Sequence, residues 1–333
     1  MPNLPKPRLR RSPRERVDQH PATASEPNVQ VVEHEGLRWI NIERPGPLDR
    51  AWLEEHFEFH PLDYEDIASR NQRPKIDEYP EYLFIVLHFP VFDKSIGRLA
   101  AGELDIFVGP DYLITLPNTP LRPVDYLFER CRGSEELREA LLSKGPGYLL
   151  YKIVDDSIDY CFPMLRKMRN KLDRLEDAIF QEQRSREAVR DISDVKQEII
   201  NFRTIIRPQR TVFRDLERTK QRYLAEDLEI EIYFDDIVDA SERIWDMLEN
   251  YKEVVEALED TNESVLSHRV NDVLRVLTAF SVIILPLTLI ASILGMNVEL
   301  PGDESIAVFW VVLGLMVAIF GGMLGYFKRR DWL

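Results

Sequence analysis

Small polar residues recur at helical spacing along a very apolar stretch close to the C-terminus. At about 100° per residue they fall within roughly a third of a helix circumference. They are Asn271, Thr278, Ser281, Thr288 and Ser292, and Leu274 and Leu285 lie on the same stripe. Several copies of this helix around one axis could line a water-filled pore and turn neutral oxygens toward a cation. Such residues are also common where membrane helices pack, and on the stripe alone packing is the commoner explanation.

Two leucines near Asn271 are candidates for a constriction. Leu274 lies about one helical turn from that residue, and Leu277 lies just under two turns from it. In a pore they would form an apolar collar, which loses its water when it narrows and so blocks ions. Ordinary packing between helices explains the same two leucines equally well, so their role stays open at this point.

The element that would position these residues is a membrane-spanning helix. Residues 276–298 carry no charge, and at about 1.5 Å per residue they can cross a hydrocarbon core of about 30 Å. After a short outer loop, residues 299–305, a second uncharged run covers 306–327. The basic residues that begin segment 328–333 are expected to stay inside the cell. The pattern predicts a multi-pass protein of the cell (inner) membrane, in contact with its lipid, with both termini cytosolic.

A long helix leads into the first span. Neither glycine nor proline occurs between Gln209 and Leu285, so one helix could run unbroken from about Leu228. We expect a stalk over residues 228–275 that continues into the span. It would be roughly 100 Å long together with the span, so it needs supporting neighbours.

Residues 151–227 are predicted to supply that support as a helical segment. Helices dominate from about Tyr148, because no glycine occurs between Gly147 and Gly295. Apolar residues recur there with the period of a helix. The two stripes are Leu165, Met168, Leu172, Leu175 and Ile179, and Ile192, Val195, Ile199, Phe202 and Ile206.

Residues 29–150 are predicted to form an α/β domain, because strand and short-helix patterns interleave. The expected elements are a hairpin turning at Glu35-Gly36, short helices over 48–57 and 62–69, a buried strand over 82–92 and a hairpin turning at 109–111. Residues 1–28 are rich in proline and arginine, and we expect a disordered basic tail.

Charge and motif content exclude several functions. The net charge is −15, and since the first 28 residues contribute +3, the remainder carries −18, which argues against a nucleic-acid partner. His56 and His60 have chelating spacing, but Pro61 disfavours helical geometry at His60, so a zinc site is not expected. Phosphate loops, nucleophile elbows and Cys-x-x-Cys pairs are absent from the sequence. We therefore expect neither an enzyme nor an organic cofactor.

The end of the first span carries a family resemblance. The runs LPLTLIASILGMN and YFKRRDWL, together with RPKIDEYPEYLFIVLHFPVFDK and YLLYKIVDDSIDYCF, resemble the CorA family of divalent-cation transporters. The signature of that family is Gly-Met-Asn at the outer end of the first of two C-terminal membrane helices. The resemblance covers nearly everything after about residue 30. It favours a pore over simple packing for the polar stripe.

The resemblance implies a fold, an ion and a set of site residues. The fold would be a funnel-shaped homopentamer whose stalk helices continue into the membrane. Gly295, Met296 and Asn297 would form the selectivity site at the outer mouth. Asp236 looks like a regulatory carboxylate of the stalk, and Asp93 like its partner on the next subunit. The ion would be hydrated Mg²⁺, or Co²⁺ or Ni²⁺, driven inward by the membrane potential, with cytosolic Mg²⁺ closing the channel.

Two alternatives remain at this stage. A zinc transporter of the same superfamily is one, although some zinc-transporting relatives carry Gly-Ile-Asn in place of Gly-Met-Asn. The other is a two-span signalling protein. An outer loop as short as residues 299–305 leaves little room for an outside sensor, and a sensor needs no polar stripe.

Overall fold

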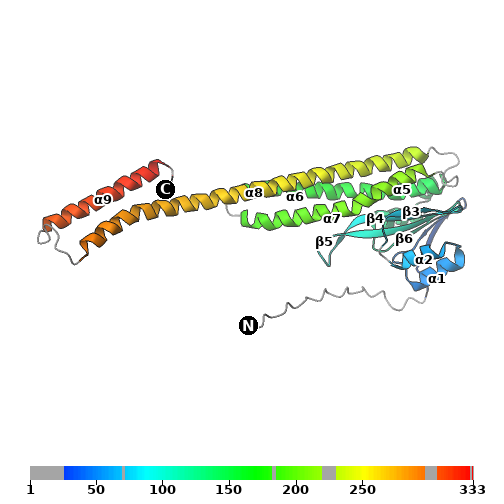
Figure 1. The fold of residues 1–333 in the computed structure, drawn as a ribbon. Helices are drawn as coiled ribbons and strands as arrows, with labels where there is room; N and C mark the ends of the chain where they lie inside the picture. The colour runs from blue at the N-terminus through cyan, green and yellow to red at the C-terminus, as the bar shows by residue number, and fades with distance from the viewer. Residues whose placement is uncertain are drawn as a thin grey trace, which may run out of the picture. The chain divides into compact units, whose positions relative to one another are not determined.

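A six-stranded mixed sheet organises the N-terminal part of the chain (Figure 1). The computed structural model describes residues 26–69, 72–181, 185–219, 230–296, 306–330 and 332. The strands are β1 Gln30–His34, β2 Leu37–Asn41, β3 Lys75–Glu78, β4 Leu83–Asp93, β5 Arg98–Val108 and β6 Tyr112–Pro117. Their order is β1-β2-β6-β5-β4-β3, and only the β2–β6 pairing is parallel.

Turn chemistry fixes the hairpins of this sheet. Glu35 and Gly36 both adopt positive φ angles, 47° and 89°, which is the geometry of a tight two-residue turn and suits glycine. The β5–β6 hairpin turns at residues 109–111, between Val108 and Tyr112. Both predicted hairpins and the predicted buried strand are confirmed.

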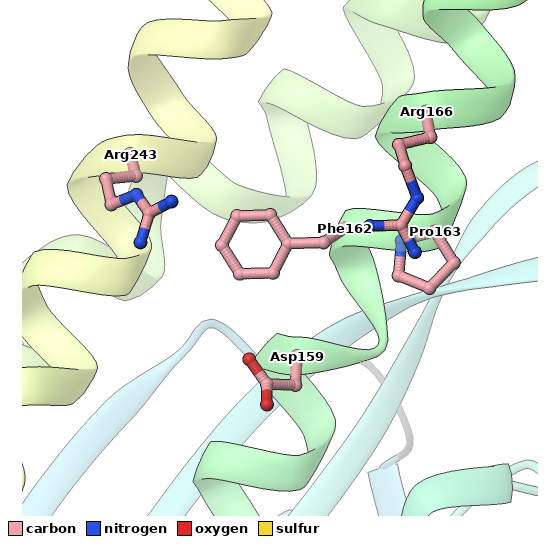
Figure 2. Close-up of a pocket in the computed structure, with 5 residues that line it drawn as sticks. All are labelled: Asp159, Phe162, Pro163, Arg166 and Arg243. Atoms are coloured by element: carbon pink, nitrogen blue, oxygen red, sulfur yellow. The ribbon is translucent and has the colours of Figure 1, made fainter.

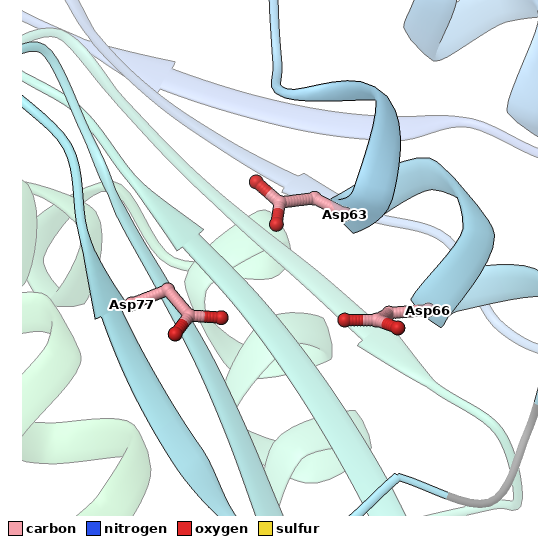
Figure 3. Close-up of side chains that lie close together, drawn as sticks. All are labelled: Asp63, Asp66 and Asp77. Carbon is pink, nitrogen blue, oxygen red and sulfur yellow. The ribbon is translucent and has the colours of Figure 1, made fainter.

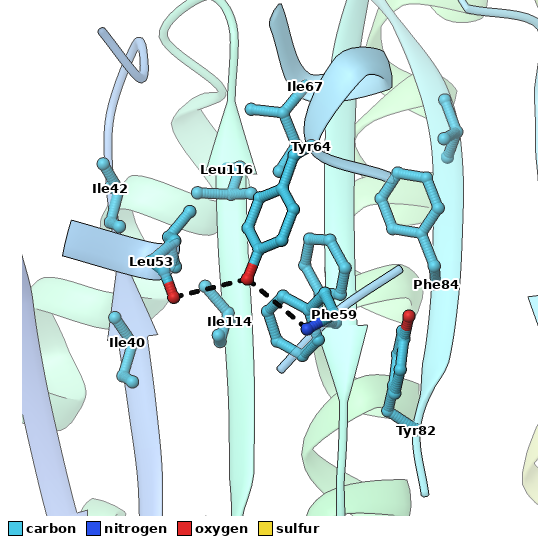
Figure 4. Close-up of a cluster of buried hydrophobic side chains, with 12 residues drawn as sticks. Ile40, Ile42, Leu53, Phe59, Tyr64, Ile67, Tyr82, Phe84, Ile114 and Leu116 are labelled. Atoms are coloured by element: carbon cyan, nitrogen blue, oxygen red, sulfur yellow. Dashed lines mark hydrogen bonds between the residues drawn. The ribbon is translucent and has the colours of Figure 1, made fainter. Parts of the chain in front are cut away.

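Helices cover both faces of the sheet. On one face lie α1 Pro47–His56 and α2 Pro61–Ser69, over an aromatic core in which Phe59 stacks on Phe107 at 4.0 Å between ring centroids (Figure 4). The Tyr64 hydroxyl donates a 2.6 Å hydrogen bond to the Phe57 carbonyl, which ties α2 to the end of α1. On the other face, the Trp39 and Phe128 rings meet edge to face at 5.0 Å.

The second face is covered by three helices, and the first two of them were not predicted from the sequence. They are α3 Arg122–Gly133, α4 Glu135–Leu142 and α5 Pro146–Asp159, so helix begins well before Tyr148. Gly133 ends α3, and Ser134 then starts α4 by accepting the Leu137 N–H. Each of these two helices is short, so its apolar residues repeat too few times for the helical pattern to be recognised in the sequence.

Four further helices make up most of the remaining chain. They are α6 Cys161–Phe180, α7 Ser185–Arg218, α8 Ile230–Leu294 and α9 Ile306–Arg329. Both predicted apolar stripes, on α6 and on α7, are buried. Their alternating spacing of three and four residues is typical of coiled-coil packing. The chain divides into two compact units, residues 1–166 with 200–248 and residues 167–199 with 249–333.

The predicted unbroken helix is confirmed in α8. It contains 65 residues, including Pro286, and is about 98 Å long. Its C-terminal part and α9 are both long and apolar enough to cross a membrane.

In the first unit, Gln209 of α7 extends the hydrogen-bonding edge of β4. Its side-chain Oε1 accepts the His88 N–H at 2.9 Å, and its Nε2 donates back to the His88 carbonyl. Gln209 is completely buried. β3 begins at Lys75, which pairs with Val86, so the strand does not reach His88. The Gln209 amide therefore satisfies the His88 backbone groups that a longer strand would otherwise bind.

Candidate ion pathway and regulatory carboxylates

The apolar part of α8 packs on α9 through one narrow face. Ala279 and Ile283 of α8 form a buried cluster with Phe327 of α9, and Leu287 and Met323 pack against it. Residues 279, 283 and 287 follow one another at intervals of four, so they lie on the same side of the helix. This side is where α8 meets the second apolar helix.

The polar stripe lies on the opposite side of α8. At 100° per residue its centre is about 180° from the face that contacts α9. Its members are exposed in the single chain: Asn271, Thr278, Ser281, Thr288 and Ser292, with Leu274 52% exposed and Leu285 69% exposed. Leu277 is 61% exposed beside it. Packing against α9 therefore does not explain these residues.

The hydroxyl groups of the stripe bond to their own helix. Thr278 Oγ1 donates to the Leu274 carbonyl at 2.7 Å, Ser281 Oγ to Leu277 at 2.9 Å, and Thr288 Oγ1 to Ile284 at 3.0 Å. Each hydroxyl hydrogen is thus used, while the oxygen keeps lone pairs that point away from the helix. The stripe consequently presents hydrogen-bond acceptors to whatever lies outside it.

The Gly-Met-Asn run begins where α8 ends. The Gly295 N–H donates to the Ala291 carbonyl at 2.9 Å, and the Met296 N–H to the Ile293 carbonyl at 3.3 Å. A Cβ at position 295 would lie 3.2 Å from the Ala291 oxygen, so glycine allows the close final turn. Met296 is 58% exposed. Asn297 lies outside the residues that the structure describes.

Asp93 lies at the end of β4, where the chain turns toward β5. Its Oδ1 accepts hydrogen bonds from the backbone N–H and the hydroxyl of Ser95, both at 2.7 Å. The Ser95 side-chain bond, followed by the backbone bond, lowers the pKa of Asp93 below its usual value. The group is therefore a carboxylate held in a fixed orientation near the tip of a hairpin.

Asp236 is exposed on α8 beside a group of carboxylates from α5. The Tyr151 hydroxyl lies 3.5 Å from Asp236 Oδ2. Burial raises the pKa of Asp159, and the nearby carboxylates of Asp155, Asp156 and Asp236 add to that rise. Sequence analysis missed the three α5 residues. Their spacing in VDDSID puts two of them one helical turn apart, which was the available signal.

Neither Asp93 nor Asp236 belongs to a group of three or more convergent metal-ligand side chains in the part of the chain that the structure describes. Over the described residues, the single group of at least three convergent metal-ligand side chains is Asp63, Asp66 and Asp77. The expected pairing of Asp93 with Asp236 across a subunit boundary is not tested by a single chain and stays a prediction.

A cavity of about 420 Å³ opens next to Asp159 (Figure 2). Phe162, Pro163 and Arg166 from the start of α6 and Arg243 from α8 line the rest of it. The Arg243 guanidinium lies over the Phe162 ring, 5.5 Å from its centroid. This contact joins α6 to α8 close to the carboxylates around Asp236.

Comparisons with known proteins agree with this geometry. The family model described as "CorA-like Mg2+ transporter protein" matches residues 34–329. The chain is 32% identical over 299 residues to the cobalt/magnesium transport protein CorA of Thermotoga maritima, covering 89% of this chain and 83% of that protein. It is 24% identical to CorA of Methanocaldococcus jannaschii, covering 92% and 96%.

A solved structure shares the fold. The complete structure of the CorA magnesium transporter from Methanocaldococcus jannaschii matches with a TM-score of 0.76 at 22% identity, over 91% of this chain and 94% of that one. The α/β domain, the long helix and the second apolar helix are therefore an arrangement already known in a solved protein.

Proposed function

Since this chain belongs to the CorA-like Mg²⁺ transporter family, we propose that it is a homopentameric channel for hydrated divalent cations, with Mg²⁺ as its main ion. As a member of the CorA superfamily it is a divalent-cation transporter and not an enzyme. One observation supports the channel most directly. The polar stripe of α8 turns away from α9 and offers oxygen acceptors along the apolar part of the helix.

Acceptors suit a cation that keeps its water. Mg²⁺ gives up its hydration shell reluctantly, and the hydrogens of the bound water molecules point outward. A pore for the hydrated ion therefore needs acceptor oxygens rather than a cage of carboxylates. Thr278, Ser281 and Thr288 provide such oxygens, because each already donates its own hydrogen within the helix. One helix cannot enclose a pore, so several subunits contribute one α8 each.

The outer mouth would be formed by the Gly-Met-Asn run. In this proposal the Asn297 amide oxygens would contact the hydration shell, and the backbone of Gly295 and Met296 would add carbonyl oxygens at the same mouth. The membrane potential supplies the driving force, because a divalent ion gains about 4.6 kcal/mol per 100 mV, twice the value for a single charge. The basic residues in the last turn of α9, Lys328 and Arg329, support an orientation with both termini in the cytosol.

Asp93 and Asp236 would couple the cytosolic ion to pore closure. Two carboxylates from adjacent subunits repel each other, and a divalent cation between them removes the repulsion and joins the subunits. The α5 carboxylates near Asp236 support this assignment, because they increase the negative charge around it. Low internal Mg²⁺ would empty these sites and allow the subunits to separate.

The decisive experiment measures ion uptake by the purified protein in liposomes that contain a Mg²⁺-sensitive dye. Asn297→Ala removes the amide contacts at the mouth, and we expect the initial rate of Mg²⁺ uptake to fall at least about tenfold. Asn250→Ala, an exposed asparagine on the same helix, is the matched control and should transport normally. Normal uptake by Asn297→Ala would refute the selectivity site. Parallel runs with Co²⁺, Ni²⁺ and Zn²⁺ identify the preferred ion and test the zinc alternative.

A further inference from the structure

Three carboxylates converge between α2 and the edge of the sheet, away from Asp93 and Asp236 (Figure 3). Asp63 and Asp66 lie on α2, and Asp77 lies on β3. One oxygen from each carboxylate lies within 4.8 Å of the others. Asp63 is 1% exposed, and the other two are partly exposed, so the group faces both the core and the solvent.

A lysine ammonium already occupies this group. Lys75 Nζ donates to Asp66 Oδ2 at 2.7 Å and to Asp77 Oδ2 at 2.5 Å. Three carboxylates around one ammonium leave an excess of two negative charges. The Lys75 side chain is 32% exposed, so its ammonium has a route to the solvent.

Two tyrosines hold the third carboxylate in place. The Tyr82 hydroxyl donates to Asp63 Oδ2 at 2.7 Å, and the Tyr79 hydroxyl donates to Asp63 Oδ1 at 3.1 Å. The two rings stack on each other with centroids 4.5 Å apart. Asp63 is therefore fixed independently of Lys75 and would keep its orientation if the ammonium moved away.

A fourth acid, Asp105, lies on the same face of the sheet and has one carboxylate oxygen without a hydrogen-bond partner among the residues described. The strand register aligns Lys75 with Val86 and Val86 with Asp105, so the three side chains project from the same face. Asp105 is 3% exposed, and its Oδ1 accepts no hydrogen bond among the residues described. Burial raises the pKa of Asp105 well above its usual value, and Glu103 and Asp66 raise it further. If Lys75 served only to join α2 to β3 through its ion pairs, a buried carboxylate with an unpaired oxygen would not be needed on this face.

We propose that Asp63, Asp66 and Asp77 form a second type of divalent-cation site, in the α/β domain, for which the Lys75 ammonium is the competing internal cation. Hard divalent ions such as Mg²⁺ and Mn²⁺ prefer carboxylate oxygens and retain several water molecules. When the ion enters, the ammonium moves to the solvent, and a water molecule on the ion has Asp105 as a buried partner. The site does not use the pore or the residues assigned to regulation.

The test replaces the competing cation. Lys75→Met keeps an apolar stem against the Phe84 ring, which the Lys75 ammonium approaches to 5.2 Å, but removes the charge. Mn²⁺ binding to the full chain in detergent is measured by electron paramagnetic resonance of the free ion. We expect Lys75→Met to show a site that binds Mn²⁺ at least about tenfold more tightly than in the wild type, because a positive charge within a few ångströms has been removed. The control is Lys171→Met, which breaks an ion pair with the single carboxylate of Glu198 and should leave Mn²⁺ binding unchanged.

A second variant decides the question if Lys75→Met does not fold. Asp77→Asn keeps Lys75 and removes one ligand. The rise in unfolding temperature caused by about 20 mM MgCl₂ should be smaller in Asp77→Asn than in the wild type, since a ligand that binds the folded state stabilises it. Mn²⁺ affinity unchanged by Lys75→Met, or equal Mg²⁺-induced shifts in wild type and Asp77→Asn, would overturn the proposal and leave Lys75 as a structural link. Other ion sites in the protein are the same in all variants, so they do not contribute to the difference between a variant and the wild type.

Discussion

A partly buried carboxylate with one unpaired oxygen makes folding stability depend on pH. Asp125 lies in the first turn of α3, and its Oδ1 accepts no hydrogen bond within the part of the chain that the structure describes. Burial, and then the negative charges of Glu43 and Glu129, raise its pKa from 3.8 to about 6. Between these two values the unfolded chain releases the proton and the folded chain retains it.

This difference fixes the sign of a pH effect. As pH rises from 3.8 to about 6, the Asp125 contribution to stability decreases, and above that range it stays unfavourable. Asp125→Asn should remove this loss and raise the unfolding temperature at pH 7 by on the order of a few degrees. Thermal unfolding measured across the pH range checks it. Asp173→Asn, an exposed carboxylate on α6, is the control. A variant that follows the wild-type curve at every pH would contradict the assignment.

Single residues differed in how well the sequence revealed them. Glu35-Gly36 and the residues 109–111 have turn chemistry that acts locally, so their hairpins could be predicted. Asp155 and Asp159 matter because α5 and α8 lie together, and Gln209 matters because β3 ends before His88. Such relations depend on tertiary contacts between distant segments, which no local pattern encodes.

At the scale of elements, period and length were the most informative signals. The long helix, both apolar stripes and the two apolar helices could be predicted, because a pattern repeated over many residues outweighs local exceptions. The parallel pairing of β2 with β6 could not, because those strands are separated by more than 60 residues of other elements. The short helices α3 and α4 were missed for lack of repeats.

The leucine collar is a property of α8 as an element. Leu274 and Leu277 are 52% and 61% exposed in the single chain, so shortening them leaves no cavity within it. If they narrow the pore, replacing both with Ser should increase basal Mg²⁺ flux several-fold, because a polar ring stays hydrated. Flux into liposomes measures the effect.

A second measurement separates this outcome from ordinary packing. The oligomeric state of the Leu274→Ser/Leu277→Ser variant in detergent should equal that of the wild type. Reduced flux together with dissociation into smaller species would show that the two leucines hold subunits together. The control is Val276→Ser, which removes a 39% exposed apolar side chain next to the two leucines but on the side of α8 opposite the stripe.

At the scale of the whole molecule, the transported ion would control the assembly. Asp93 and Asp236 are both accessible on one subunit, and neither belongs to a group of three or more convergent ligand side chains among the residues described. Asp93→Ala combined with Asp236→Ala should weaken the protection that Mg²⁺ gives the soluble part against proteolysis. The ion can shift the equilibrium only by its difference in affinity between closed and open forms, multiplied over equivalent sites.

The control for this experiment changes carboxylates elsewhere. Asp173→Ala with Glu198→Ala alters two acids of α6 and α7 and should leave the Mg²⁺ protection intact. Full protection of the Asp93→Ala/Asp236→Ala variant would show that these two residues are not the sensor, and Asp155 and Asp159 would be tested next. Because Lys75 and its three carboxylates are intact in all of these variants, the proposed site in the α/β domain does not affect the comparison.

The continuity of α8 has a consequence for the length of this protein. Within one unit, Tyr251, Val255 and Leu258 lie on a buried face of the helix, and the stripe that begins at Asn271 lies on another. Adding one residue between them would rotate the stripe by about 100° about the helix axis and turn apolar side chains such as Val273 and Ile284 toward the place of the hydroxyls. Seven residues would nearly restore the orientation but move the stripe by about 10 Å along the axis. The segment between the buried face and the stripe therefore tolerates substitution far better than insertion or deletion.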